Sequence, residues 1–372
     1  MKILHITSPK TWRGGEQQLI YLAEELKAKG VEQEIMCPFN SSVHKYCLKH
    51  HFPHVTYFKG FSANPMVAFR VTHVSRRTHA DLIHVHDSHA HNFAVLSSVL
   101  TNNPLPIIVS RRVDFAIQGT SMSLFKYNHP NIKKILCVSR AIHDIMLKSI
   151  EDVSKLSVVH SGVDLQRFEG VAKGNALRKE FRIPDDYSLV GNVAALAPHK
   201  DYPTFLRVAK RMIDDGEKVK FVAIGEGPDR QEIEDAIADA GLIDHVYLAG
   251  FRNNVPQLLK ELDAFLITSK TEGLGTSILD AIASGTPVIA TSAGGIVEII
   301  EDGENGLLCD VGDDGQLAAA VKRMLSDAAL MKACVQAGLQ TVKNFSKEET
   351  ARKTLELYRE VLESASDSER DA

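Results

Sequence analysis

The sequence predicts an α/β protein built from two parallel-sheet domains. Its 372 residues are many for one hydrophobic core and ordinary for two. Short apolar runs of strand length alternate with helical patterns almost without a break, as in parallel sheets with crossover helices. A second alternating series begins near Ser188, after the extended segment Val158–Asp164. Each series is therefore expected to form its own sheet.

The first series opens with an apolar strand at Lys2–Thr7 and a turn at Arg13–Gly15. A helix is expected from Glu16 to Gly30, because apolar residues recur at helical spacing and glycine readily adopts the left-handed conformation that ends a helix. Further strands are predicted at Glu34–Cys37, Leu82–His86, Ile107–Ser110 and Ile135–Val138. A helix is predicted to begin at Ser139.

The second series carries the same alternation to the C-terminal region. Its strands are predicted at Leu189–Val193, Lys220–Ile224, Val246–Ala249, Ala264–Ile267 and Pro287–Thr291. Its helices are predicted at roughly 202–214, 228–240, 254–261, 276–284 and 313–327. A last helix is expected over 347–363, since Leu355, Tyr358 and Leu362 share one side. Residues 365–372 are expected to form a disordered tail.

Composition indicates a cytoplasmic protein. No apolar run approaches the ~20 residues that span a bilayer. The chain enters a strand pattern at Lys2, which argues against a signal peptide. The five cysteines are scattered without metal-ligand spacing, which indicates buried reduced thiols.

Charge divides unevenly between the two halves. Residues 1–160 hold 19 Lys and Arg against 11 Asp and Glu, a net charge of +8, and the remainder carries −12. One interpretation is that the first half meets an anionic acceptor or the inner face of the membrane. The other is uneven surface charge without a partner. No nucleic-acid partner is predicted.

The segment Thr271–Ala281 is the strongest candidate for a ligand site. It is a glycine-containing loop leading into the first turn of a helix, where free N–H groups and the helix dipole favour phosphate. Glu272 and Asp280 could accept hydrogen bonds from hydroxyl groups. Backbone N–H groups that can bind phosphate, with a carboxylate on each side that can bind hydroxyl groups, suit a nucleotide-sugar.

Other candidate residues also follow strands, and parallel sheets bind ligands beyond the carboxyl ends of their strands. Each has an ordinary structural explanation as well: a tight turn at Gly14-Gly15, a strand-to-helix turn at Gly225–Gly227, and a solvated ammonium at Lys200. His84 and His86 are expected to divide between the core and the site. No metal is predicted, because no acidic or cysteine ligands accompany the histidines.

Five motifs follow one another along the chain: Gly14-Gly15-Glu16, Ser161–Phe168, Lys200-Asp201, Gly225–Pro228 and Glu272–Asp280. Their order resembles that in the GT-B glycosyltransferases, most closely the large retaining family 4, also called glycosyl transferases group 1. The resemblance covers nearly the whole chain and is most specific over Glu272–Asn305.

The resemblance implies two Rossmann-like domains facing across a cleft. The N-terminal, acceptor-binding domain would comprise residues 1–165 and a crossover helix at 346–364. The C-terminal domain, 166–345, would bind the nucleotide-sugar. Glu272 would hold the donor sugar and Asp280 the ribose. The diphosphate would meet Lys200, Gly15 and the backbone of the remaining loop residues, which are Gly273, Leu274, Gly275, Thr276 and Ser277.

The resemblance also adds Gly225, Phe251 and Arg252 to the donor site, and His86 to the catalytic residues. Two departures from the family pattern stand out. Ala195 replaces an arginine that binds the diphosphate, and Arg111-Arg112 stand where a histidine is common. We hypothesise that Arg111 or Arg112 supplies the missing positive charge.

The predicted function is a retaining, metal-independent glycosyltransferase that needs no cofactor. It would move a sugar from a UDP- or GDP-linked donor to a glycan or lipid-linked acceptor, in cell-surface polysaccharide or lipopolysaccharide synthesis. Peripheral membrane contact through the basic N-terminal domain is a further expectation, centred on Asn64–His79. Two alternatives stay open: a non-catalytic GT-B protein that binds a nucleotide-sugar or serves as a partner subunit, and a GT-B epimerase or phosphorylase.

Overall fold

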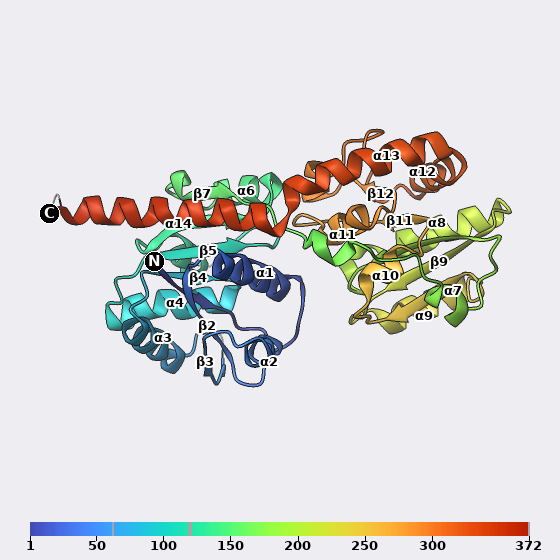
Figure 1. Ribbon diagram of the computed structural model, residues 1–372. Helices are drawn as coiled ribbons and strands as arrows, with labels where there is room; N and C mark the ends of the chain where they lie inside the picture. The colour runs from blue at the N-terminus through green and yellow to red at the C-terminus, as the bar shows by residue number, and fades with distance from the viewer. Residues whose placement is uncertain (62, 118–120, 371–372) are drawn as a thin grey trace. The chain divides into compact units, whose positions relative to one another are not determined.

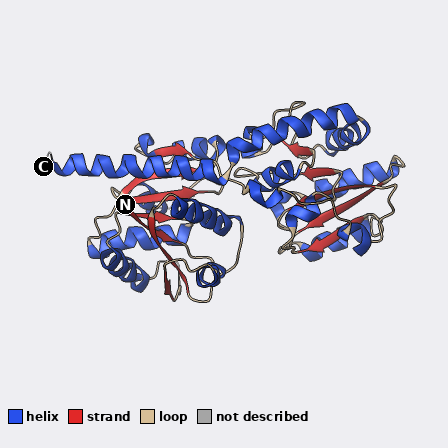
Figure 2. Ribbon diagram, viewed as in Figure 1, coloured by secondary structure: helices blue, strands red, loops and turns tan. Residues whose placement is uncertain are grey.

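The computed structural model describes residues 1–61, 63–117 and 121–370, and they form two compact units. Unit 1 contains Met1–Gly162 together with the C-terminal segment that begins at Lys347, and unit 2 is Val163–Ser346. Both units are α/β, with helices on the faces of a parallel sheet (Figure 2). The unit boundaries lie three residues before, and one residue after, the predicted boundaries at 165/166 and 345/346.

Unit 1 contains a seven-stranded parallel sheet in the order β3-β2-β1-β4-β5-β6-β7. The strands are β1 (Lys2–Ile6), β2 (Glu32–Pro38), β3 (His54–Tyr57), β4 (Leu82–Val85), β5 (Ile107–Arg111), β6 (Ile132–Cys137) and β7 (Leu156–Val158). The helices are α1 (Gly14–Ala28), α2 (Ser42–Lys49), α3 (Pro65–Thr78), α4 (Ser88–Thr101), α5 (Ser121–Asn128), α6 (Arg140–Leu147) and α14 (Lys347–Arg370). A short 3-10 turn, η1 (Val153–Lys155), precedes β7.

The C-terminal helix α14 completes the core of unit 1, where it lies beside α1 (Figure 1). Its buried side chains Ala351, Leu355 and Tyr358 pack in one cluster with Ile3 of β1 and Leu22 of α1. The helix continues to Arg370, so residues 365–370 are helical where the sequence predicted a disordered tail. The segment contains neither glycine nor proline, the residues that most strongly end helices.

Unit 2 contains a six-stranded parallel sheet in the order β10-β9-β8-β11-β12-β13. The strands are β8 (Ser188–Val193), β9 (Val219–Ile224), β10 (Val246–Gly250), β11 (Ala264–Ile267), β12 (Val288–Thr291) and β13 (Leu307–Cys309). The helices are α7 (Ala176–Glu180), α8 (Tyr202–Asp214), α9 (Arg230–Asp239), α10 (Val255–Leu259), α11 (Thr276–Ser284), α12 (Asp314–Ser326) and α13 (Ala328–Thr341). Short 3-10 turns are η2 (Leu165–Phe168), η3 (Pro198–Lys200), η4 (Gly294–Glu298) and η5 (Val342–Phe345).

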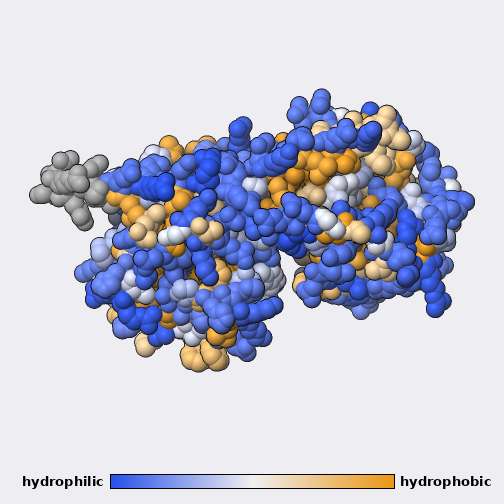
Figure 3. All heavy atoms as spheres, viewed as in Figure 1, coloured by the Kyte–Doolittle hydropathy of each residue, from blue (hydrophilic) through white to orange (hydrophobic). Residues whose placement is uncertain are grey.

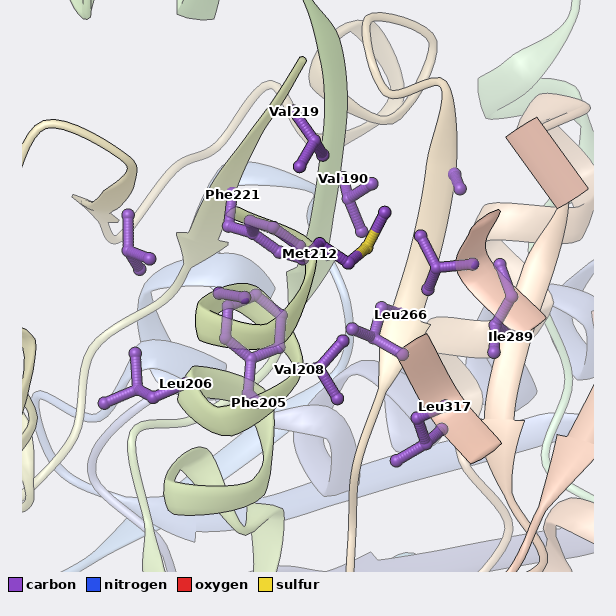
Figure 4. Packing of buried hydrophobic residues seen from close by; sticks show 14 of the residues in the cluster. Val190, Phe205, Leu206, Val208, Met212, Val219, Phe221, Leu266, Ile289 and Leu317 are labelled. Atoms are coloured by element: carbon purple, nitrogen blue, oxygen red, sulfur yellow. The ribbon is translucent and has the colours of Figure 1, made fainter. Parts of the chain in front are cut away.

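The core of unit 2 fills the space between α8 and the sheet (Figure 4). Phe205 of α8 meets Phe221 of β9 edge-on, with ring centroids 5.6 Å apart. Such edge-to-face pairs add specificity to simple burial. α8 therefore anchors the loop that precedes it, which carries Lys200.

The start of α1 and the state of the cysteines can be compared with the predictions. The helix expected from Glu16 begins at Gly14, because the Glu16 carboxylate accepts a hydrogen bond from the Arg13 N–H and caps the first turn. The five cysteines are buried free thiols, as predicted. No helix within the described ranges has the length and apolar character needed to cross a membrane.

Candidate active site

A partly buried ion pair joins two loops of unit 2. Lys200 ends η3, which follows β8, and Glu272 follows β11, the neighbouring parallel strand. Lys200 Nζ lies 2.5 Å from Glu272 Oε1, and the two side chains are 14% and 9% exposed. Ser269 Oγ donates a 2.8 Å hydrogen bond to the same carboxylate oxygen. The carboxyl ends of adjacent strands thus bring a cation and an anion together at one edge of the sheet. The sequence placed both residues after strand ends but did not predict that they pair.

The backbone of Glu272 is held by a glycine turn. Gly295 N–H donates a 3.0 Å hydrogen bond to the Glu272 carbonyl. Gly294 has φ +53°, and a Cβ atom there would lie 2.1 Å from that carbonyl oxygen. Only glycine permits this approach. The Gly294-Gly295 motif therefore fixes the position from which the Glu272 side chain reaches Lys200.

The helix α11 starts at Thr276, four residues after Glu272. Its N-cap is Gly275, with φ +90° and no side-chain cap, so the first turn keeps backbone N–H groups available. Together with the helix dipole, these donors attract an anion. A candidate phosphate-binding site and Glu272, which pairs with Lys200, therefore lie on one short segment of chain.

Asp280 lies on α11 and faces the 3-10 turn η2. Burial raises the pKa of its carboxyl to about 6, against the opposing charge of Arg167 and with a small contribution from Asp164. Arg167 also lines a surface recess of about 600 Å³ with Phe251, whose ring is 63% exposed, and with Arg252. An exposed aromatic ring beside polar side chains could stack against a planar base.

Gly225 and Gly227 have a structural reason to be glycine. A Cβ at Gly225 would lie 1.9 Å from the Ala194 carbonyl oxygen, and one at Gly227 would lie 2.1 Å from the Leu196 carbonyl oxygen. These contacts let the loops after β8 and β9 run against each other. Ala195 lies between two residues whose N–H groups bond to the Ile224 and Glu226 carbonyls, and its own side chain is exposed.

In unit 1, three imidazoles gather on one face of the sheet. His5 Nδ1 lies 3.0 Å from His86 Nε2, and His84 contacts the Tyr358 hydroxyl at 2.5 Å and Ser110 Oγ at 2.8 Å. The prediction that His84 and His86 would divide between core and site is wrong, since both are buried. Residues two apart on a strand share one face.

Burial lowers the pKa of all three imidazoles, to about 4 for His5 and well below the usual value for His84 and His86. Their ligand atoms lie within 4.8 Å of one another, close enough to be considered for a metal. The charge of Arg112 lowers the pKa of His84 and His86 further, and the same charge would oppose a divalent cation. The arrangement favours neutral, hydrogen-bonded imidazoles.

The two arginines at the end of β5, Arg111 in the strand and Arg112 directly after it, contact different partners. Arg111 Nη1 donates to the Tyr127 hydroxyl at 3.0 Å, and the guanidinium lies over the Phe115 ring at 5.0 Å. Arg112 Nη1 donates to the His86 carbonyl at 3.1 Å, and burial lowers the pKa of Arg112 to about 10. Gly15 lies in the first turn of α1 with open space where a Cβ would be.

Two family models match the chain in succession. Residues 12–167 match Glycosyltransferase Family 4, and residues 174–341 match Glycosyl transferases group 1. The lipopolysaccharide core biosynthesis glycosyltransferase LpsE of Rhizobium meliloti is 26% identical over 351 residues, covering 94% of this chain and 96% of the relative. The chain belongs to the GT-B glycosyltransferases of group 1.

Other similarities agree with this assignment. The 2-deoxystreptamine glucosyltransferase of Streptomyces kanamyceticus is 34% identical over 187 residues, which are 49% of this chain and 48% of that relative. A crystal structure of Anabaena HepE in complex with UDP and glucose superposes with a TM-score of 0.84 at 20% identity, covering 96% of this chain and 99% of that one. That structural similarity confirms the predicted fold class.

This glycosyltransferase thus has the fold and enzyme class that the sequence predicted, whereas the roles of individual site residues stay predictions. The structure brings together Lys200, Glu272 and the start of α11. Sequence reasoning missed Ser269, which bonds to Glu272, and Arg167, which faces Asp280. Sequence reasoning also missed His5, although the alternation of side chains along β1 places His5 on the same face as Ile3.

Proposed function

We propose that the chain is a retaining, metal-independent glycosyltransferase that uses a nucleoside-diphosphate sugar, with UDP-hexoses as the first candidates. The observation that carries the proposal is the Lys200–Glu272 pair beside the uncapped N-terminus of α11. The UDP and glucose bound in the HepE crystal structure support the choice of base and sugar class.

The pair suits exchange with a ligand. With no donor bound, Lys200 neutralises Glu272, and Ser269 adds a hydrogen bond. A diphosphate at the start of α11 would share the Lys200 ammonium, and Glu272 would then accept hydrogen bonds from sugar hydroxyls. The same cation and amides would stabilise the leaving diphosphate as charge develops on it.

In this proposal the leaving diphosphate takes the proton of the acceptor hydroxyl, and the new bond forms on the face that the diphosphate leaves. Asp280 would hold the ribose, and the recess at Phe251 would hold the base. Gly15, Arg111, Arg112 and His86 belong to the proposal as unit 1 residues that act on the diphosphate or the acceptor. The acceptor would be a glycan or lipid-linked glycan at the inner face of the membrane, in keeping with the role in lipopolysaccharide core synthesis for which LpsE is named.

A thermal-shift series with UDP-, GDP-, ADP- and CMP-sugars tests the donor. A ligand that binds only the native state at about 100 times its Kd stabilises by about 2.7 kcal/mol. We expect UDP-hexoses to raise the melting temperature and Lys200→Gln to remove most of that rise. A preference for CMP-sugars would contradict the proposal. Turnover that chelation by EDTA abolishes would contradict metal independence, and an inverted anomeric configuration in the product would contradict retention.

A further inference from the structure

Lys200 directly precedes a residue with a strained main chain. The 3-10 turn η3 leads into Asp201, which has φ +51° and ψ 55° and caps α8. This left-handed conformation costs a non-glycine residue free energy, so it persists only where neighbouring groups hold it. The Asp201 carboxylate accepts hydrogen bonds from the Thr204 hydroxyl at 2.6 Å and from the Thr204 N–H at 3.4 Å. The position of Lys200 therefore depends on the groups that hold this turn.

The loop directly after β11 holds the turn. Thr268 Oγ1 lies 3.0 Å from the Lys200 carbonyl oxygen and 3.1 Å from the Asp201 carbonyl oxygen. A hydroxyl has one proton, so it donates to the two carbonyls in a bifurcated hydrogen bond. Lys270 adds two contacts: its N–H donates to the His199 carbonyl at 2.8 Å, and its ammonium lies 3.5 Å from Asp201 Oδ1. The loop thus contacts three successive residues of the turn.

The same loop also holds Glu272. The hydroxyl of Ser269 donates to the Glu272 carboxylate. The Ser269 carbonyl in turn accepts a 2.7 Å hydrogen bond from the Thr291 hydroxyl. Lys200 and Glu272 are therefore held separately, Lys200 through its main chain and Glu272 through its side chain. Opening of the ion pair requires no movement of either anchor.

The core of unit 2 is complete without the Thr268 hydroxyl. Leu266 of β11 packs in one buried cluster with Phe205 and Val208 of α8, which fixes the strand against the helix (Figure 4). Hydrophilic residues predominate around the rim of unit 2 on the face in view (Figure 3), whereas Thr268 is fully buried. A buried hydroxyl keeps its partners, because water does not compete for them. The Thr268 bond therefore acts on the turn that carries Lys200.

We propose that Thr268 is a positioning residue for Lys200. Its hydroxyl holds the Lys200 main chain while the ammonium passes from Glu272 to the diphosphate of the donor. Only the side-chain dihedral angles of Lys200 then change, so the cation reaches the phosphate in one defined place. In this proposal Thr268 touches no part of the donor and acts through Lys200. The inference rests on the proposed function, in which Lys200 binds the diphosphate.

The alternative is that the hydroxyl only stabilises the fold. Thr286 offers the comparison, because it is also buried in unit 2 and donates to a carbonyl, that of Leu259, at 2.8 Å. A bond that only stabilises the fold changes the melting temperature but does not distinguish UDP from UMP. A bond that positions Lys200 affects UDP more, because only UDP has the second phosphate. The ratio of the two dissociation constants separates these roles.

Calorimetric titration of the full chain with UDP and UMP tests the proposal. Thr268→Val keeps the shape of the side chain and removes its donor. We expect the Kd for UDP to rise about tenfold and the Kd for UMP to change by less than about twofold. Thr268→Ser restores the hydroxyl and should bring the Kd for UDP to within about threefold of the wild-type value. Thr286→Val, the matched control, should leave both values within about twofold.

A double-mutant cycle shows whether Thr268 acts through Lys200. In a Lys200→Gln background, Thr268→Val should change the Kd for UDP by less than about twofold. A loss that persists in that background, equal losses for UDP and UMP, or no recovery with Thr268→Ser would each overturn the proposal. If Thr268→Val does not fold, Thr268→Cys replaces it, since a thiol is a weaker donor of similar size. UDP must then again lose more affinity than UMP.

Amide hydrogen exchange separates this inference from the proposed function, since it needs no nucleotide. We expect faster exchange over residues 197–204 in Thr268→Val than in Thr286→Val. Wild-type protein that binds no nucleoside diphosphate, together with this faster exchange, would remove the proposed donor but keep Thr268 as the residue that positions Lys200. UDP binding that is equally strong in the wild type and in Thr268→Val would remove this inference alone.

Discussion

Each unit gathers polar side chains toward the carboxyl ends of its central strands, but the two clusters differ in charge. In unit 2, Lys200 and Glu272 form an ion pair that solvent still reaches. In unit 1, His5, His84 and His86 are buried, and burial lowers the pKa of each imidazole. A charged pair can exchange partners with a ligand, whereas buried neutral imidazoles hold strands and helix together and can offer a ligand hydrogen bonds but no charge. Clusters in equivalent places of the two sheets therefore suit different tasks.

The largest expected effect is acid sensitivity of unit 1. The folded pKa values of the three imidazoles lie below the unfolded value of about 6.5, so the unfolded chain binds protons that the folded chain does not. Stability should therefore fall as pH drops below about 6.5, by roughly 1.4 kcal/mol per pH unit for each histidine, until the folded pKa is reached. For His5 that lower limit is about 4.

Fluorescence of Trp12, the single tryptophan, reports urea unfolding of unit 1 and measures this effect. Burial also lowers the pKa of His91 in the same unit, so His5→Gln should reduce the slope with pH by about a quarter. Asp280 in unit 2 acts in the opposite direction: its folded pKa of about 6 lies above the unfolded value, so falling pH favours the native state between about 6 and 4. A Trp12 transition that is unchanged or strengthened by acid would show that the imidazoles are not held neutral.

The next effect is on catalysis. Glu272→Gln keeps the size of the side chain but removes the charge that pairs with Lys200. We expect turnover of the donor to fall about 100-fold or more while the melting temperature changes little. Glu234→Gln, on the exposed i,i+4 pair with Arg230, is the control and should keep wild-type turnover. Equal turnover in the two variants would remove Glu272 from the site.

A smaller effect tests the glycine turn that holds Glu272. Gly294→Ala would place a Cβ 2.1 Å from the Glu272 carbonyl oxygen. Overlap and the left-handed backbone together should cost roughly 2–4 kcal/mol in the free energy of unfolding. Gly303→Ala has a similar positive φ but open space around the Cβ, so it should cost only about 1 kcal/mol. Similar losses in both variants, measured by denaturant unfolding, would show that the carbonyl contact is unimportant.

The smallest effect concerns one hydrogen bond of the histidine cluster. Tyr358→Phe removes the hydroxyl that contacts His84 Nδ1 and should cost about 1 kcal/mol, with faster amide exchange in α14. Tyr247→Phe removes an exposed hydroxyl that donates to the Asp244 carbonyl and should cost less. A smaller cost for Tyr358→Phe than for Tyr247→Phe would argue that the buried contact adds no stability.

The parts of the fold with strong local signals were predictable. The bounds of α8 and α11 match the predicted ranges, because apolar spacing and a glycine just after the end mark both helices, and a proline marks the start of α8. The strands β3, β7 and β13 were missed, because each has only three or four residues and is recognisable mainly through its neighbour in the sheet. Short edge strands carry little periodic signal.

The candidate site also contains residues that could be predicted from the sequence and residues that could not. Glu272 and the start of α11 were predictable because one short segment contains them, and Lys200 because adjacent parallel strands end together. Arg167 was not, since its position near Asp280 depends on how η2 returns to α11 across more than a hundred residues of chain. His5 joins His84 only through the register of β1 with β4.

The chain order of the units has a consequence for biosynthesis. Unit 2 is continuous in sequence, so all of its core is synthesised before α14. Unit 1 needs α14, which follows unit 2 in the chain, to cover Ile3 and Leu22. A chain cut off after residue 346 would therefore have all of unit 2 but a unit 1 whose apolar face remains open to chaperones.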